Sequence, residues 1–318
     1  YDLERKFMIS IIIPVFNNEN SLEDLYKTIN KDIVAENPDL KGEIIFIDDG
    51  STDNSFNNLL ELKKKNAKDN IQITLIKLTR NFGQIFAIQS GYLHSKGECI
   101  VNIAADLQDP PSIVNKMLFH HYNDSYDIVI AVRNSRQESL FRRITSRIFY
   151  SIINRLIFRN MPPAGFDIVL INNTVKKYVL ELDESDPFWQ GQILWPGYKP
   201  KFIYYERKKR KSGKSKWTMM KKIKYLIDGI MGYSFFPIRM ITLIGIFISL
   251  SGFIYALYIV VLRLSSQDLV YGWAPLMIVI LILGGFQLLM LGIIGEYLWR
   301  ILSQVRNRPK FIIEKIIE

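Results

Sequence analysis

Two long charge-free stretches in the C-terminal third constrain the fold of this 318-residue chain more than any other feature. The first, Met240–Leu262, holds 23 residues, and the second, residues 269–295, holds 27. A helix rises about 1.5 Å per residue, so each stretch exceeds the roughly 30 Å hydrocarbon thickness of a bilayer. Buried helices of soluble domains rarely run this long without a charge, and the sequence therefore predicts two transmembrane helices.

Basic residues flank the two stretches on one side of the predicted membrane. RKKRKSGKSK (207–216) precedes the first stretch and RNRPK (306–310) follows the second, whereas the loop at about 264–271 holds one acidic residue and no basic residue. The positive-inside rule then places both termini and the N-terminal region in the cytoplasm. We predict four parts: a large domain at 1–216, a juxtamembrane interfacial helix at 217–236, a two-helix anchor at 237–302 and a cytoplasmic tail at 303–318.

The net charge narrows the choice of partner. Lys and Arg outnumber Asp and Glu by 41 to 31, which gives a formal charge of +10. Such a balance suits nucleic acid, an anionic membrane surface or a phosphorylated substrate. The basic residues cluster near the predicted membrane rather than along a groove, so lipid phosphate accounts for them better and we expect no nucleic-acid partner.

The first part of the chain alternates between strand-length apolar runs and helix-period segments. The apolar runs are Met8–Phe16, Glu43–Ile47, Ile71–Leu78, Cys99–Ala105 and Asp127–Val132. The helical segments are Ser21–Val34, Asp53–Asn66, Gln84–Ser95 and Ile113–Tyr122. Nearly continuous Ile, Val, Leu and Phe in the runs are typical of strands that are covered on both faces. The order predicts an α/β domain with a mostly parallel sheet.

A polar turn follows each of the first four predicted strands: PVFNNE, DDGSTD, TRNFGQ and ADLQD. Ligands of parallel sheets bind at the carboxyl ends of the strands, so four polar turns at that edge predict a binding site. No GxGxxG or Walker sequence is present, and nicotinamide cofactors and P-loop ATP chemistry therefore lose support. In TRNFGQ, Arg80 could offset phosphate charge and Gly83 could let the backbone approach a ligand, although an ordinary turn is the alternative.

The DDGSTD turn has a structural and a functional interpretation. Gly50 permits a left-handed turn, and Ser51 or Asp53 could cap the following helix. This leaves Asp48 and Asp49 unexplained, because adjacent carboxylates repel each other without a donor or cation nearby. We therefore favour a functional role for Asp49.

The ADLQDPP segment concentrates acid at a predicted strand end. Asp106 and Gln108 could direct oxygens to one side, and Mg²⁺ or Mn²⁺ prefers such ligands together with substrate phosphates. Asp109 precedes two prolines and fits the N-cap of the next helix. We assign Asp106 to a metal and Asp109 mainly to the cap.

These motifs, in this order and ahead of two spans, resemble one family. The chain is similar to the family 2 glycosyltransferases that load a sugar onto a polyprenyl phosphate, including dolichol-phosphate mannose synthases and bacterial undecaprenyl-phosphate glucosyltransferases with a two-helix anchor. The resemblance also covers SRQ (135–137), GFDIVL (165–170), RKSGKSKW (210–217) and GEYLWR (295–300). It implies a cytoplasmic, Rossmann-like GT-A domain that two transmembrane helices anchor in the inner (cytoplasmic) membrane.

The resemblance also implies roles for individual residues. Those implied to bind the nucleotide sugar are Pro14, Phe16, Glu19, Asp49, Asn81, Gly83, Gln84, Arg210 and Ser215. Asp49 would lie near the base or ribose, and Arg210 and Ser215 belong to the segment that closes over the site.

On the reactive side, Asp106 and Gln108 would hold Mg²⁺ or Mn²⁺ against the diphosphate. Arg133 and Arg136 would face the acceptor phosphate, and Asp167 stands where the family carries a candidate catalytic aspartate. Two further positions depart from the family pattern, since Ala104 replaces a frequent aspartate and Val169 a frequent arginine.

The implied reaction is an inverting transfer of a hexose from a nucleotide sugar to polyprenyl phosphate. UDP-glucose is the expected donor, with GDP-mannose and N-acetylated or modified pentose donors open, and a homo-oligomer is open as well. A phosphate monoester is largely deprotonated at neutral pH, so charge neutralisation matters more than a strong base. Asp167 would orient the acceptor or a basic residue, or take a residual proton.

Two segments rich in basic and apolar residues suit the membrane border. They are residues 139–158 and 217–236. For the first, a helix packed on the core with a solvated basic face is an equal alternative, whereas adjacency to a span favours the interface for the second.

Two other functions remain as alternatives. A processive polysaccharide synthase would carry more spans and an acceptor-site Gln-x-x-Arg-Trp signature, which this sequence lacks. A non-catalytic, membrane-anchored partner that binds sugar nucleotide or lipid finds support only in Ala104.

Overall fold

The chain forms two compact units. The computed structural model describes residues 8–38, 40–67, 71–133, 151–158, 161–162, 165–206, 219–265 and 273–318. The first unit comprises Tyr1–Tyr225 and Pro309–Glu318, and the second comprises Leu226–Arg308.

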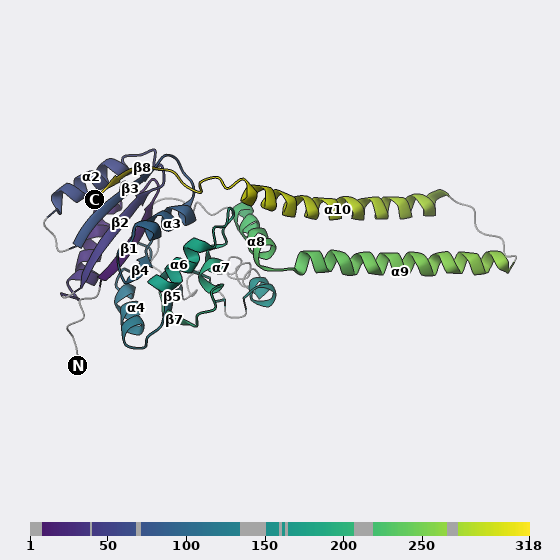
Figure 1. The fold of residues 1–318 in the computed structure, drawn as a ribbon, viewed down its shortest axis with the longest axis horizontal. Coiled ribbons are helices and arrows are strands. Elements are labelled where there is room, and N and C mark those ends of the chain that lie inside the picture. The colour runs from purple at the N-terminus through teal and green to yellow at the C-terminus, as the bar shows by residue number, and fades with distance from the viewer. Residues whose placement is uncertain are drawn as a thin grey trace. The chain divides into compact units, whose positions relative to one another are not determined.

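An eight-stranded sheet in the order β7-β5-β6-β4-β1-β2-β3-β8 forms the centre of the first unit (Figure 1). Its strands are β1 Met8–Val15, β2 Lys41–Asp48, β3 Ile71–Leu78, β4 Cys99–Asn102, β5 Ile128–Arg133, β6 Phe166–Asn172, β7 Pro200–Tyr205 and β8 Ile313–Ile317. Strands β4, β1, β2 and β3 are mutually parallel, as are β5 and β7, whereas β6 and β8 run antiparallel to their neighbours. The predicted α/β domain with a mostly parallel sheet is confirmed.

Helices cover both faces of this sheet. They are α1 Leu22–Ile29, continued by the π-helical turn η1 Asn30–Val34, then α2 Ser55–Lys65, α3 Gln84–His94, α4 Ile113–Tyr122, α6 Asn173–Glu181 and α7 Trp189–Leu194. The apolar faces of α1, α2 and α4 share one core with Ile9, Ile11 and Ile13 of β1. Helix α3 packs on the opposite face so closely that a Cβ atom at Gly91 would lie 2.6 Å from the Ile12 side chain. Coverage on both faces explains the uninterrupted apolar runs of the strands.

The strand order reverses at β1, and this reversal positions the site. Strands β2 and β3 follow β1 on one side, whereas β4 pairs with β1 on the other side. In open α/β sheets, ligands bind outside the carboxyl ends of the strands at such a switch point. The turns after β1 and β4 therefore flank the expected crevice.

The end of the chain forms a strand that the sequence analysis did not predict. Within the expected cytoplasmic tail at 303–318, Ile313–Ile317 form β8 at the edge of the sheet, beside β3. The backbone N–H of Thr79 donates to the Ile312 carbonyl at 3.0 Å and extends this pairing. The apolar residues of this segment pair with the edge of the sheet, and no local sequence pattern predicts that pairing.

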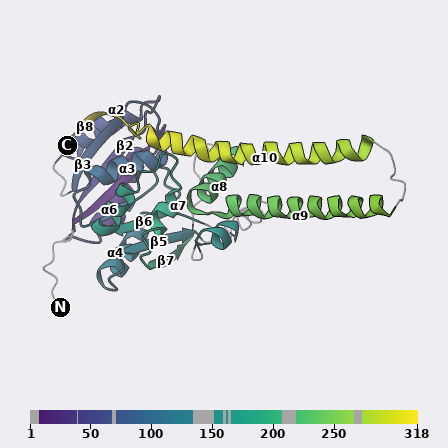
Figure 2. The same cartoon turned by 45° about the vertical axis from the view of Figure 1, so that its right-hand side comes forward.

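The second unit contains the predicted anchor. Helix α8 (Met219–Tyr233) continues into it from the first unit, and α9 (Phe236–Leu264) and α10 (Trp273–Val305) follow. Segments Phe236–Val261 and Leu276–Val305 are long and apolar enough to cross a membrane, and their apolar side chains are exposed. Helices α9 and α10 run in opposite directions (Figure 2). Exposed apolar surface of this extent requires a lipid or protein partner, and both helices are therefore candidate membrane spans.

A charged cluster joins two helices within the second unit. The Arg300 guanidinium of α10 lies 2.6 Å from the Asp228 carboxylate of α8 and 2.9 Å from Glu296, one turn earlier in α10. Arg300 and Asp228 are largely shielded, with side-chain exposures of 16% and 11%. The sequence predicted a helix at 217–236, and α8 occupies most of it. Of the other expected amphipathic segment, residues 139–150 lie outside the described residues.

Candidate active site

The turns after β1 and β2 are bonded to each other at the carboxyl edge of the sheet. The backbone N–H of Asn17 donates to Ser51 Oγ at 3.0 Å, and the Asn17 side-chain oxygen accepts from the Thr52 N–H at 2.9 Å. The Glu19 carboxylate accepts from the Asn54 N–H at 3.0 Å. Glu19, which was expected to line the nucleoside pocket, thus also fixes the neighbouring turn.

Asp49 ties the second turn to the third. Its carboxylate is 3% exposed and accepts from the backbone N–H groups of Phe82 and Gly83, at 2.7 and 3.0 Å. Gly50 adopts φ +68°, and a Cβ atom there would lie 2.4 Å from the Arg80 backbone. Glycine is therefore required where the two turns touch. The three turns form one connected rim.

Burial raises the pKa of Asp49 from 3.8 to about 6, against the two N–H groups, which favour the ionised form. The folded state then holds this proton more tightly than the unfolded state. Its contribution to the free energy of unfolding is greatest below pH 4, falls by about 3 kcal/mol as the pH rises to about 6, and stays low above that pH.

We expect Asp49→Asn to remove this part of the pH dependence of the thermal unfolding midpoint. Equal slopes for the variant and the parent between pH 4 and 6 would contradict the assignment.

A hollow of about 440 Å³ opens beside this rim, within the size range of small-molecule sites. Its lining residues come from the three turns, from β3 and from β8: Phe16, Gly50, Ser51, Thr52, Lys77, Leu78, Thr79, Arg80, Asn81 and Glu314. The Arg80 guanidinium lies 4.2 Å from the centre of the Phe82 ring. Phe16 and Asn81, which were both predicted to bind the nucleotide sugar, thus line the same hollow. Pro14 lies within β1 and Gln84 opens α3.

The acidic turn after β4 lies beside the first turn. Ser21 Oγ donates to the Ala105 carbonyl at 2.8 Å, and the Gln108 N–H donates to Asp106 Oδ1 at 3.2 Å. Leu107 adopts φ +56°, which makes the turn between Asp106 and Gln108 tight. Both predicted metal ligands are half-buried. Among the described residues, no three His, Cys, Asp or Glu side chains converge, so a cation here would need substrate or water oxygens as well.

The capping role assigned to Asp109 is wrong. Helix α4 begins at Ile113 with Ser112 as its N-cap residue, so Asp109 lies three residues too early. Its buried carboxylate instead accepts from the Tyr205 hydroxyl at 2.6 Å, which joins the acidic turn to the end of β7. The sequence offered no signal for this contact, because β7 was not predicted.

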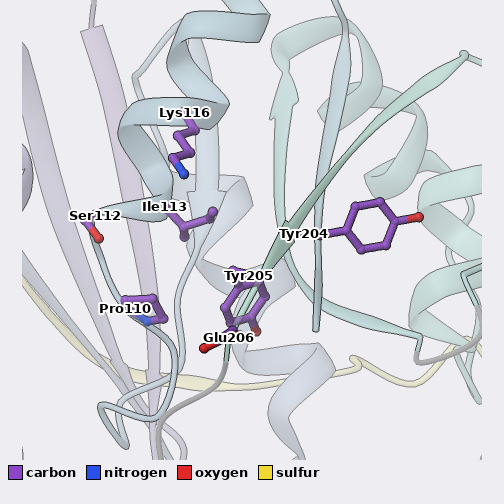
Figure 3. Close-up of a pocket in the computed structure, with 7 residues that line it drawn as sticks. All are labelled: Pro110, Ser112, Ile113, Lys116, Tyr204, Tyr205 and Glu206. Atoms are coloured by element: carbon purple, nitrogen blue, oxygen red, sulfur yellow. The ribbon is translucent and has the colours of Figure 1, made fainter. Parts of the chain in front are cut away.

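A second hollow of about 280 Å³ lies next to the acidic turn (Figure 3). It is lined by Pro110, Ser112, Ile113, Lys116, Tyr204, Tyr205 and Glu206. Tyr204 points away from Tyr205, which is expected of successive residues in a strand. Arg210 and Ser215 were also predicted to bind the nucleotide sugar, but residues 207–218 lie outside the described part of the chain.

Arg133 and Asp167 form an ion pair at the adjacent ends of β5 and β6. The two side chains are 22% and 40% exposed, so the pair can be reached from solvent. Both residues also act on Tyr205. Burial and the Asp109 carboxylate together raise the pKa of Tyr205 above its usual value. Arg133 opposes this increase and Asp167 adds to it. The acidic turn and the ion pair therefore lie around one tyrosine. Arg136, which was expected to face the acceptor phosphate, lies outside the described residues.

Asn102, which sequence reasoning missed, supports this ion pair. Its side-chain N–H donates to the Asp167 carbonyl, and its oxygen accepts from the Val169 N–H at 3.3 Å. The backbone register of β4 with β6 extends from Cys99 to Val101, so the Asn102 side chain continues the pairing where the ladder ends. A buried amide in an apolar strand was the available signal.

We expect Asn102→Ala to lower the thermal unfolding midpoint and also to reduce turnover. The substitution leaves the Asp167 carbonyl and the Val169 N–H without this partner, at a cost of about 1–3 kcal/mol. Unfolding and turnover should be followed in the same detergent preparation, with the exposed Asn57→Ala on α2 as the control. An unchanged midpoint with Asn102→Ala would show that these bonds carry little weight.

This fold occurs among solved glycosyltransferases. A mannosyltransferase from Pyrobaculum calidifontis in complex with GDP-Man and Mn²⁺ superposes with a TM-score of 0.50 at 16% identity, over 70% of this chain and 62% of that chain. This likeness shows a fold of the GT-A kind. Residues 10–181, more than half of the chain, match the family model described as Glycosyl transferase family 2. The chain belongs to this family.

Curated relatives are similar over almost the whole chain, including both apolar helices. An uncharacterized glycosyltransferase of Synechocystis sp. is 34% identical over 97% of this chain and 95% of its own length. A prophage-derived bactoprenol glucosyl transferase of Shigella flexneri is 32% identical over 96% of this chain and 97% of its own length.

Proposed function

We propose that this protein transfers glucose from UDP-glucose to a polyprenyl phosphate at the cytoplasmic face of the inner membrane, with inversion at the anomeric carbon. The observation that carries the proposal is the similarity to a bactoprenol glucosyl transferase, which extends through the two candidate spans. A polyprenyl acceptor stays in the bilayer, so an enzyme with its own anchor can meet the phosphate at the membrane surface. The basic segments that flank the two candidate spans support the expected orientation, with both termini cytoplasmic.

The donor would bind across the switch point of the sheet. Its nucleoside would occupy the hollow that Phe16 and Asn81 line, and its diphosphate would extend toward the turn after β4. Asp106 and Gln108 supply oxygen ligands that suit Mg²⁺ or Mn²⁺, and the tight turn at Leu107 places the Gln108 N–H 3.2 Å from the Asp106 carboxylate. When bound, the cation neutralises charge on the diphosphate leaving group.

The acceptor phosphate would bind at Arg133. A phosphate oxygen forms the new bond to the anomeric carbon while the bond from that carbon to the nucleoside diphosphate breaks. Because the phosphate is already largely ionised at neutral pH, the chain mainly has to hold two anions together. Asp167 orients the guanidinium of Arg133, and the arginine offsets the acceptor charge.

Turnover by the full chain in liposomes tests the proposal. The liposomes should hold undecaprenyl phosphate, with Mn²⁺ or Mg²⁺ and a panel of nucleotide sugars, and the lipid product should be identified by mass spectrometry. We expect a mass increase of one hexose with UDP-glucose. Donor binding without any glycolipid product would favour the non-catalytic partner instead, and a product with GDP-mannose alone would reassign the sugar.

A further inference from the structure

The C-terminal strand reaches the hollow that we assign to the nucleoside. Strand β8 pairs antiparallel with β3, with Leu78 opposite Ile313 and Lys77 opposite Lys315. Glu314 lies between these pairs, at an irregularity in the register. A β-bulge of this kind bends the strand and re-aims a side chain, and bulges are frequent next to active sites.

The re-aimed side chain meets a basic partner at the wall of the hollow. The Glu314 carboxylate lies 2.8 Å from Lys77 Nζ, and both residues line the hollow with Phe16 and Asn81. The two side chains are 48% and 30% exposed. An exposed ion pair of this kind contributes only about 0–1 kcal/mol to stability, so holding β8 in place is a weak reason for it.

We infer that Lys77 and Glu314 contact the nucleobase of the donor, so that the segment after the second candidate span completes the donor site. The inference rests on the proposed function and extends it to base recognition. A nucleobase edge presents N–H donors next to carbonyl acceptors, and this pair offers the complementary carboxylate acceptor and ammonium donor. Uracil fits with its N3–H between two carbonyl groups.

Binding of UDP to the full chain tests this inference. With Mn²⁺ present, we expect Glu314→Gln and Lys77→Met each to weaken UDP binding in calorimetry by about 5- to 20-fold, since each removes one charged hydrogen-bond partner. The matched control is Glu318→Gln, because Glu318 lies 3.5 Å from Lys96 beyond the same strand and does not line the hollow. This control should bind UDP within about twofold of the parent chain.

The exchanged pair, Lys77→Glu with Glu314→Lys, separates base contact from strand anchoring. The exchange restores an ion pair between β3 and β8. It also swaps the positions of the hydrogen-bond donor and the hydrogen-bond acceptor that line the hollow. We expect a parental unfolding midpoint with UDP binding still weakened. Recovery of UDP binding by the exchange, or parental affinity in both single variants, would overturn this inference but leave the proposed function standing. A parent chain that binds no nucleoside diphosphate would overturn the proposed function as well.

Discussion

Replacing Asp106 with asparagine is expected to lower kcat/KM for glycolipid formation by about 10²- to 10³-fold, the usual effect of losing one electrostatic stabiliser. Asp106 is the only carboxylate of the two predicted metal ligands, and Gln108 adds a neutral oxygen. The loss should depend on the cation, since asparagine is a weaker ligand for a hard divalent ion. Turnover of the purified full chain should therefore be measured over a titration of Mn²⁺, where the variant requires a higher concentration for half-maximal rate.

Two further variants make the metal assignment specific. Asp124→Asn is the matched control, because Asp124 is an exposed carboxylate that pairs with His120 at the end of α4. Ala104→Asp adds the carboxylate that this chain lacks and should lower the Mn²⁺ concentration for half-maximal rate. The assignment fails if Asp106→Asn and the parent chain share one rate curve across the titration.

The elements that the sequence predicted well are those with strong local periodicity. Ile71–Leu78 and Ile113–Tyr122 coincide with β3 and α4 to the residue. Strand β4 ends at Asn102, three residues before the predicted Ala105, because the chain leaves the sheet there to form the acidic turn. Apolar runs thus locate strands well and their ends less well.

What the sequence could not predict depends on contacts between distant segments. Strand β8 gains its partner 237 positions away, at Lys77, and a short apolar segment after two spans carries no sign of this pairing. The Asp109–Tyr205 bond joins residues 96 positions apart, so the local Asp-Pro-Pro pattern favoured a cap. Polar turns predicted which edge of the sheet carries the candidate site, but not which side chains meet there.

The pairing of Arg133 with Asp167 shows this limit at the reactive side and leads to the second large effect. The sequence analysis left open whether Asp167 orients the acceptor or a basic residue, and the structure pairs it with Arg133. If they act as one unit, Arg133→Ala and Asp167→Asn should each lower kcat/KM by about 10²-fold or more at saturating donor. The double variant should then be little worse than the more impaired single variant, because removing either partner already disables the unit.

A second ion pair and a pH profile separate this unit from its alternatives. Lys177 and Glu181 form an exposed pair 3.9 Å apart on α6, and removing it should leave turnover unchanged. If Asp167 positions Arg133, Asp167→Asn lowers the rate equally across the pH range. A residual base at Asp167 would instead make the loss depend on pH, and strictly additive losses in the double variant would show that the two residues act independently. Full turnover by Asp167→Asn at saturating lipid would remove Asp167 from the mechanism, and the acceptor phosphate would then depend on arginine without a positioning carboxylate.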